Sequence, residues 1–139
     1  MSEIITTISP TTGEPILTRN GISQQELEQL PEIAKKAFES WRTTKLADRQ
    51  AIIRKALAIL DERKDELATE LTVQMGRPIA YTPKEIGTAI KRAEDMMSIS
   101  DEALQDTPGQ AEPGFKRFIR KVPVGPVLII FAWNVGVDP

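Results

Sequence analysis

Asn134 is the residue of this sequence with the clearest potential for chemistry. It follows an apolar run, residues 127–131, which is typical of a strand buried on both faces. Side chains at the carboxyl ends of such strands commonly contact ligands in α/β proteins. An Asn amide there can donate an N–H to an oxygen that gains negative charge during a reaction. Asn is also a common turn residue at a strand end, so its position alone supports both interpretations.

Two residue types on which much enzyme chemistry depends are missing from the sequence. Its 139 residues include no Cys and no His. A thiolate nucleophile, a disulfide, a Cys-ligated metal and an imidazole base are therefore excluded. The scattered glycines form neither a P-loop nor a GxGxxG motif. We expect no metal site.

The charged residues are interpreted as solvated surface. The formal charge of −2, from 18 Lys+Arg against 20 Asp+Glu, argues against nucleic-acid or anionic-membrane partners. A basic cluster with interleaved Phe residues, 115–121, is interpreted as the protected edge of a strand. Carboxylate pairs are expected on helix exteriors and a methionine pair in the core: Asp61/Glu62, Asp65/Glu66, Glu94/Asp95 and Met96/Met97.

Helical periodicity dominates residues 23–105, where apolar residues recur every three or four positions. Ser23 and Glu26 form a capping box that predicts the start of a first helix. That helix is expected to end near Trp41. Pro31 interrupts its pattern and leaves a later start open.

Two further helical stretches follow in the sequence. Residues 46–75 repeat with helical spacing, with a break expected near 61–65, and Gly76 predicts a left-handed end. Thr82 followed by Pro83 predicts a Thr N-cap for the next helix.

Strands are expected at both ends of the chain. Two β-branched runs around a Pro- and Gly-containing turn predict a hairpin within residues 1–22. Residues 115–122 predict an exposed strand, and 127–131 a strand for a parallel sheet. The fold class is therefore α/β, mostly helical, and too little chain follows Trp133 to complete that sheet.

Several segments of the sequence resemble the aldehyde dehydrogenase superfamily over about residues 4–134. The resemblance ends at a Trp-Asn motif, beyond which the residues are unrelated and suggest truncation. The segments that resemble the family are Ile8-Ser9-Pro10-Thr11-Thr12-Gly13-Glu14, Ala37-Phe38-Glu39-Ser40-Trp41, Ile53-Arg54-Lys55-Ala56-Leu57, Met75-Gly76-Arg77-Pro78 and Val122-Pro123-Val124-Gly125-Pro126-Val127 with Trp133-Asn134.

The resemblance implies a partial active site. Asn134 matches the family's oxyanion-binding Asn, and Phe131, Ala132 and Trp133 match the strand end that lines the dinucleotide pocket. Ala132 departs from the family, which commonly has Pro there. The family's Cys nucleophile, Glu base, cofactor Lys and Gly-rich turn have no counterpart in this sequence.

These matches imply a truncated relative of NAD(P)-dependent enzymes that oxidise aldehydes to carboxylic acids. We expect this chain alone to be inactive, a pseudoenzyme, and to bind no NAD(P). The alternative is a non-enzymatic protein that associates with full-length aldehyde dehydrogenases. Exposure of residues 127–131 would favour self-association or pairing with such relatives. We expect a cytoplasmic protein with one partial domain over 1–139, divided into a hairpin (1–22), a helical part (23–105) and strands (115–134).

Overall fold

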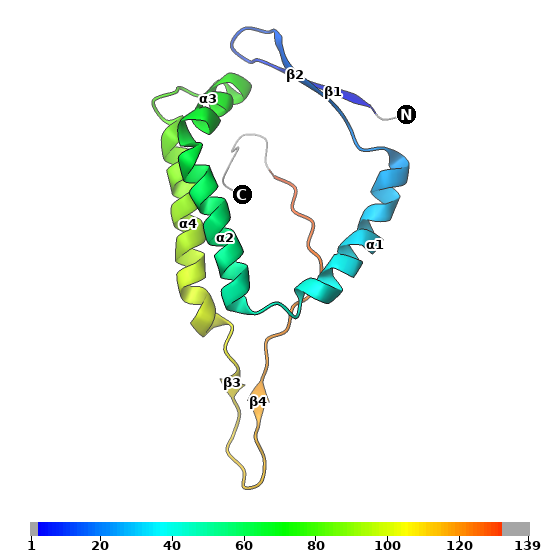
Figure 1. Cartoon of the computed structure of the whole chain (residues 1–139), viewed down its shortest axis with the longest axis vertical. Helices are drawn as coiled ribbons and strands as arrows, with labels where there is room; N and C mark the ends of the chain where they lie inside the picture. Colours follow the sequence, from blue (N-terminus) through cyan, green and yellow to red (C-terminus); the bar gives the residue numbers. More distant parts are fainter. Residues whose placement is uncertain (1–2, 132–139) are drawn as a thin grey trace.

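The computed structural model describes residues 3–131, which form a hairpin, four helices and a second, much shorter strand pair (Figure 1). The first hairpin pairs β1 (Ile4–Ile8) with β2 (Pro15–Asn20) in antiparallel register, as the sequence predicts. Its turn is held by the buried Ser9, whose hydroxyl oxygen accepts the backbone N–H groups of Thr11 and Thr12 at 3.3 Å. The serine hydroxyl thus accepts two backbone N–H groups of the turn that have no partner in the strand ladder.

Helix α1 (Gln24–Trp41) begins at the predicted capping box. Ser23 Oγ accepts the backbone N–H of Glu26 at 3.3 Å, and Glu26 Oε2 accepts that of Ser23 at 2.9 Å. The alternative start at Pro31 is wrong, because the helix runs through this proline. The reciprocal cap stabilises the start at Gln24. This stabilisation offsets the backbone hydrogen bond that is lost at Pro31, which has no N–H. No residue of α1 is buried.

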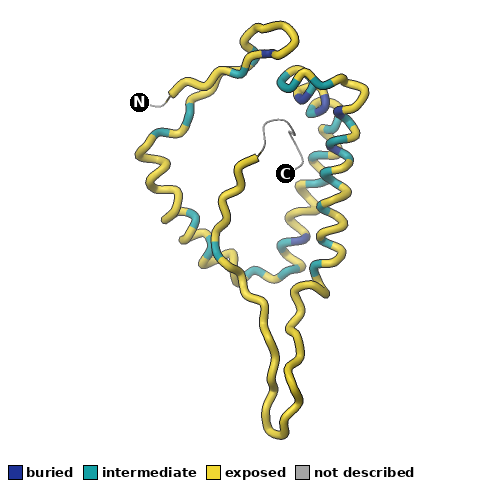
Figure 2. Tube along the Cα trace, turned by 180° about the vertical axis from the view of Figure 1, so that it is seen from behind, coloured by how far each residue is buried: buried dark blue, intermediate teal, exposed yellow. Residues whose placement is uncertain are grey.

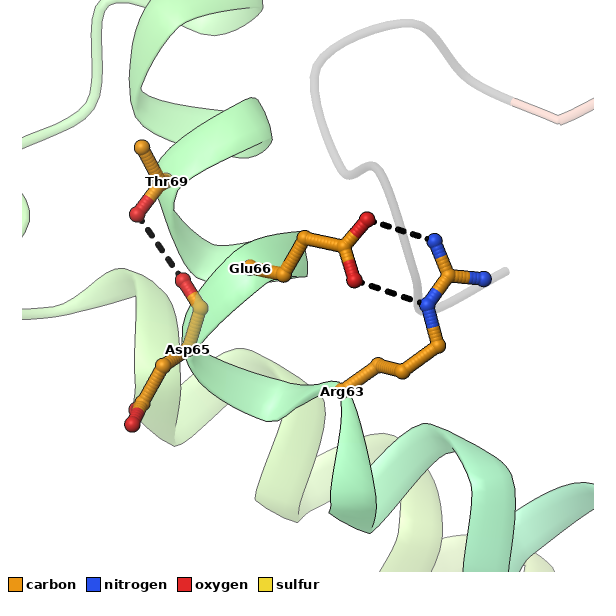
Figure 3. Close-up of polar contacts among 4 residues, drawn as sticks. All are labelled: Arg63, Asp65, Glu66 and Thr69. Carbon is orange, nitrogen blue, oxygen red and sulfur yellow. Dashed lines mark hydrogen bonds and ion pairs between the residues drawn. The ribbon is translucent and has the colours of Figure 1, made fainter.

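Helices α2 (Leu46–Glu62) and α3 (Lys64–Met75) are separated at Arg63, which confirms the predicted break. Arg63 clamps the first turn of α3 through a two-point pair with Glu66, Nε to Oε2 at 2.8 Å and Nη2 to Oε1 at 2.7 Å (Figure 3). Figure 3 also shows Thr69, whose hydroxyl donates to the carbonyl of Asp65 at 2.8 Å. Both side chains are about half exposed, so this two-point pair makes a modest, salt-sensitive contribution to the first turn of α3.

Gly76 ends α3 in the left-handed conformation, with φ of 71°, as predicted. The same glycine lies against the first hairpin, since a Cβ added there would meet Pro10 Cγ at 2.9 Å. Both the positive φ and the close approach favour glycine at this position.

Helix α4 (Thr82–Ala103) packs against α3 and α2 and completes a small core of Ala68, Leu71 and Ile86. The prediction of Thr82 as N-cap is wrong, because Tyr81 takes that position and Thr82 is the first helical residue. Thr82 is fully buried, and its Oγ1 lies 3.2 Å from Thr72 Oγ1 of α3. The same hydroxyl also donates to the carbonyl oxygen of Ile79 at 3.4 Å, so it bonds to α3 and to the preceding turn and does not cap the first turn of α4.

The C-terminal strands differ from the prediction. β3 (Thr107–Pro108) pairs with β4 (Phe118–Ile119), so the strand expected over 115–122 is confined to two residues. The strand expected over 127–131 is not formed, and these side chains are 59–85% exposed. A parallel strand needs a neighbour for its ladder, and the described part of the chain offers none to this segment.

Burial is concentrated where α2, α3 and α4 meet, and most of the remaining chain is exposed (Figure 2). Met96 is 61% exposed, so the prediction of a buried methionine pair is wrong for this residue. Within residues 3–131, no helix combines the length and hydropathy needed to cross a bilayer. The cytoplasmic location and the division into subregions stay predictions.

Candidate functional site

Phe131 is the one member of the predicted site that lies within the described residues. Ala132, Trp133 and Asn134 lie outside them. Phe131 ends a segment without secondary structure, residues 122–131, which runs back between α1 and α2–α4 in the views of Figures 1 and 2. Its side chain is 59% exposed. A side chain this open does not by itself wall a pocket for a cofactor.

The start of this segment is fixed by the short strand pair. Arg120 binds Asp106 through two nitrogens, with Nε 3.1 Å from Oδ1 and Nη2 2.7 Å from Oδ2. The next residue, Lys121, donates from Nζ to the carbonyl oxygen of Ala103 at 2.6 Å, at the end of α4. The chain entering the predicted site is thereby tied to the carboxyl end of a helix, where a cation is favoured.

The electrostatics of this anchor favour the ionised pair. The hydrogen bond from Arg120 lowers the pKa of the Asp106 carboxyl below its ordinary value of 3.8. The same bond raises the pKa of the Arg120 guanidinium. The guanidinium also lies 4.7 Å from the ring centroid of Phe118, a cation–π distance. The pair therefore remains charged at neutral pH and holds the segment in place.

A cavity of about 340 Å³ opens beside the anchor. It contains two cationic side chains, Arg49 and Lys121, and one anionic side chain, Asp101. Its complete lining is Leu46, Arg49, Asp101, Leu104, Gln105, Lys121, Val122 and Pro123. This lining includes no nucleophile and no paired carboxylates at its centre, so the cavity offers packing and charge but no acid–base chemistry.

Sequence reasoning missed Gln50, the polar centre of the α2–α4 contact. Its Nε2 lies 2.9 Å from Ser100 Oγ and 3.1 Å from Asp101 Oδ2. The sequence does contain a signal for the burial of Gln50. This residue stands three positions before Ile53 and seven before Leu57, so it lies on the apolar stripe of the helix. A polar residue on such a stripe indicates a buried hydrogen-bond network.

The carboxylate pairs lie on the surface as the sequence suggests, whereas the basic cluster 115–121 forms a strand only at Phe118–Ile119. All six paired carboxylates are exposed, and several charged side chains form surface ion pairs, such as Glu66 with Arg63 and Asp95 with Lys91. In the basic cluster, Arg117 pairs with Glu112 and Arg120 with Asp106. Among residues 3–131, no three His, Cys, Asp or Glu side chains come together as a cation site.

The residues that the structure describes do not form a dinucleotide pocket. Phe131 is open to solvent, and residues 127–131 contribute no strand to a sheet on which a cofactor could lie. The fit of this chain to NAD(P) therefore depends on surfaces beyond its described residues.

Comparisons with known proteins give a consistent assignment. The sequence model of the Aldehyde dehydrogenase family matches residues 1–137. The chain is 31% identical over 130 residues to a probable succinate-semialdehyde dehydrogenase [NADP(+)] of Synechocystis, covering 94% of this chain and 28% of that protein. It is 29% identical over 132 residues to glutarate-semialdehyde dehydrogenase of Pseudomonas putida, covering 95% and 28%.

Solved structures of aldehyde dehydrogenases show the same fold, and this chain again matches about a quarter of their length. HpcC from Thermus thermophilus matches with a TM-score of 0.87 at 21% identity, covering 97% of this chain and 26% of that chain. Succinic semialdehyde dehydrogenase from Streptococcus pyogenes, solved with NADP⁺, matches with a TM-score of 0.70 at 27% identity, covering 78% and 24%. The chain thus spans about a quarter of the length of the relatives it matches. With a family match over nearly all of its residues, the chain belongs to the aldehyde dehydrogenase family.

Proposed function

We propose that this chain supplies part of an aldehyde dehydrogenase site and oxidises no aldehyde by itself. The observation that supports this proposal most directly is coverage: the family match includes almost the whole chain but only about a quarter of the relatives. The family's reaction needs a thiolate, a base and a hydride acceptor, and this sequence contains no Cys.

The contribution that we assign to this chain centres on Asn134. Its side-chain N–H would donate to the aldehyde oxygen as that oxygen becomes an oxyanion, a role in which one donor contributes about 10²–10³ in rate. Phe131, Ala132 and Trp133 would form one wall beside the cofactor. NAD(P) supplies the hydride acceptor when it is bound, and the exposure of Phe131 supports the proposal that this chain alone does not bind it.

The test of inactivity is direct. The purified chain is incubated with NAD⁺ or NADP⁺ and with succinate semialdehyde, which is named for one relative. We expect no NAD(P)H fluorescence above a blank and no heat of cofactor binding in calorimetry. Steady NAD(P)H formation that persists after a second purification step would contradict the proposal.

A second candidate function is a non-enzymatic partner of full-length aldehyde dehydrogenases. It is favoured by the large apolar side chains that this chain leaves exposed, especially over residues 127–131. Sedimentation of the chain mixed with an intact relative distinguishes the two candidates. Co-sedimentation without any effect on activity would favour the partner role.

A further inference from the structure

An Asn-Gly pair, Asn20 and Gly21, stands where β2 ends and the chain turns toward α1. In a free chain an Asn that precedes Gly is chemically labile. Glycine has no side chain to shield its backbone nitrogen from the amide carbon of the preceding side chain. The pair is therefore a candidate site for a covalent change that needs no enzyme.

The change would convert the side-chain amide of Asn20 into a carboxyl group in two steps. In the first step the backbone nitrogen of Gly21 loses its proton and attacks Cγ of Asn20. The new N–Cγ bond closes a cyclic imide, the Cγ–Nδ2 bond breaks, and the amide leaves as ammonia. Water then opens the imide at either of its carbonyl carbons, which gives Asp or isoaspartate. The net reaction consumes water and releases ammonia, with no oxidant or reductant.

In the folded chain the nitrogen that must attack already donates a hydrogen bond. The backbone N–H of Gly21 lies 2.7 Å from the carbonyl oxygen of Glu3, at the short end of the range for such bonds. This bond stabilises the protonated nitrogen, whereas the reaction needs the deprotonated one. The first step therefore requires the Gly21–Glu3 bond to break.

The conformation of Asn20 also opposes ring closure. Asn20 is the last residue of β2 and pairs with Ile4 of β1. A strand residue has ψ near about +135°, which turns the following nitrogen away from its own side chain. Closing the imide requires rotation about the Cα–C bond of Asn20. That rotation would carry Gly21 away from β1, which it approaches so closely that an added Cβ would meet Glu3 O at 3.1 Å and Ile5 Cδ1 at 3.3 Å.

We propose that Asn20–Gly21 is a deamidation site that the first hairpin protects and that reacts when the end of β1 separates from β2. Within residues 3–131 the Gly21–Glu3 bond is the outermost backbone bond of this hairpin. The end of a ladder opens at a lower free energy than the fold as a whole. The inference is independent of the proposed aldehyde dehydrogenase site.

The change is one-way for the hairpin. Isoaspartate carries the main chain through its former side chain and so adds a backbone carbon between β2 and the cap at Ser23. The added atom displaces Gly21 from its position opposite Glu3, so the outermost bond does not form again. The site thus records how often the hairpin has opened.

The experiment incubates the full chain in mildly alkaline buffer, with and without guanidinium chloride, and follows position 20 by mass spectrometry of tryptic peptides. We expect deamidation to be at least tenfold slower in the folded chain. Asn134 is the internal control, because the branched side chain of Val135 hinders the nitrogen that follows it. Equal rates at position 20 with and without denaturant would overturn the protection. No reaction at Asn20 in denaturant would overturn the site itself.

Two variants separate opening of the hairpin from unfolding of the chain. Ile5→Pro places a residue without an N–H opposite Arg19 in the ladder and should raise the rate at least tenfold, with unchanged helical circular dichroism. Gln50→Ala weakens the contact between α2 and α4 instead and should change the rate less than twofold. Equal acceleration by both variants would overturn the inference, because the reaction would then follow global unfolding.

Hydrogen exchange of the Gly21 amide gives a second measure of the same opening. In Ile5→Pro the exchange rate of this amide and the deamidation rate should rise by the same factor. Faster exchange without faster deamidation would overturn the proposed link between them. Asn20→Gln, whose longer side chain must close a larger ring, should react at least tenfold more slowly in denaturant. An unchanged rate for this variant would contradict attack on the side-chain amide of residue 20.

Discussion

Gln50 of α2 donates its side-chain N–H to the hydroxyl of Ser100 of α4 at 2.9 Å, in the least exposed part of the contact between these helices. Gln50 is 8% exposed, and its Oε1 accepts from Arg54 Nη2 at 3.3 Å. The two helices are therefore joined by a polar network as well as by apolar packing. A nearly buried amide with partners on both sides fixes the relative position of the helices.

Replacing Gln50 tests this network. Gln50→Ala leaves Ser100 and Asp101 without their amide donor, so we expect a loss of about 1–3 kcal/mol in the free energy of unfolding. The matched control is Gln24→Ala on α1, which removes an exposed side-chain bond to Glu28 and should cost less than about 0.5 kcal/mol. Urea unfolding followed by circular dichroism measures both. Equal losses would show that the buried amide has no special role.

Gly76 joins the end of α3 to the turn of the first hairpin. Gly76→Ala forces an alanine to a φ of 71° and brings its Cβ to 2.9 Å from Pro10 Cγ. Gly13→Ala imposes a similar φ of 75° with nothing within 4 Å. We expect about 1–2 kcal/mol of destabilisation from the backbone in both variants and an additional loss only at Gly76.

A double variant isolates the contact with the hairpin. Adding Pro10→Ala to Gly76→Ala should remove the additional loss but leave the backbone cost. Thermal unfolding of the unchanged chain, Pro10→Ala, Gly76→Ala and the double variant gives the coupling free energy between residues 10 and 76. A coupling of zero would contradict the close approach of the hairpin to α3.

The Arg63–Glu66 clamp predicts a site-specific pH response. The hydrogen bond from Arg63 lowers the pKa of the Glu66 carboxyl below its ordinary value of 4.5. A depressed pKa means that the clamp stabilises the fold fully above pH 4.5 and that this contribution is lost as the pH falls through the lower, folded value. Both groups are exposed, so the effect is screened by salt.

Carboxyl titration by NMR measures this response. Arg63→Gln should return the pKa of Glu66 toward 4.5, while the pKa of Glu26 stays low because Ser23 causes its shift. A Glu66 titration that is unchanged by Arg63→Gln would show that the clamp does not form in solution.

Local signals in the sequence predicted most helix ends correctly. The capping box at Ser23 and Glu26 and the left-handed glycine at position 76 depend on neighbouring residues, and both were confirmed. Thr82 was misassigned because a hydroxyl's tertiary partner, here Thr72, lies outside any local motif. For Gln50 a local signal exists, its position on the apolar stripe of α2, but that signal does not identify its partners Ser100 and Asp101, which lie about 50 residues away in the sequence.

The strand expected at 127–131 shows a different limit of local pattern. Its sequence has the composition of a buried strand, but a strand forms only where another strand can pair with it. The sequence pattern shows that residues 127–131 favour a strand, but it does not show whether another strand is available to pair with them. The catalytic contribution of Asn134 likewise follows from the family match and its position after this segment, and it stays a prediction.

The exposure of residues 127–131 is tested most directly by analytical ultracentrifugation of the intact chain over a range of concentrations. The exposed segment predicts concentration-dependent self-association into a series of species. The double variant Leu128→Lys, Ile130→Lys should reduce it strongly, whereas Gln29→Lys, which also adds positive charge, should not. A single compact monomer at every concentration, with cooperative unfolding, would contradict the account, because residues 127–131 would then have found their cover within this chain.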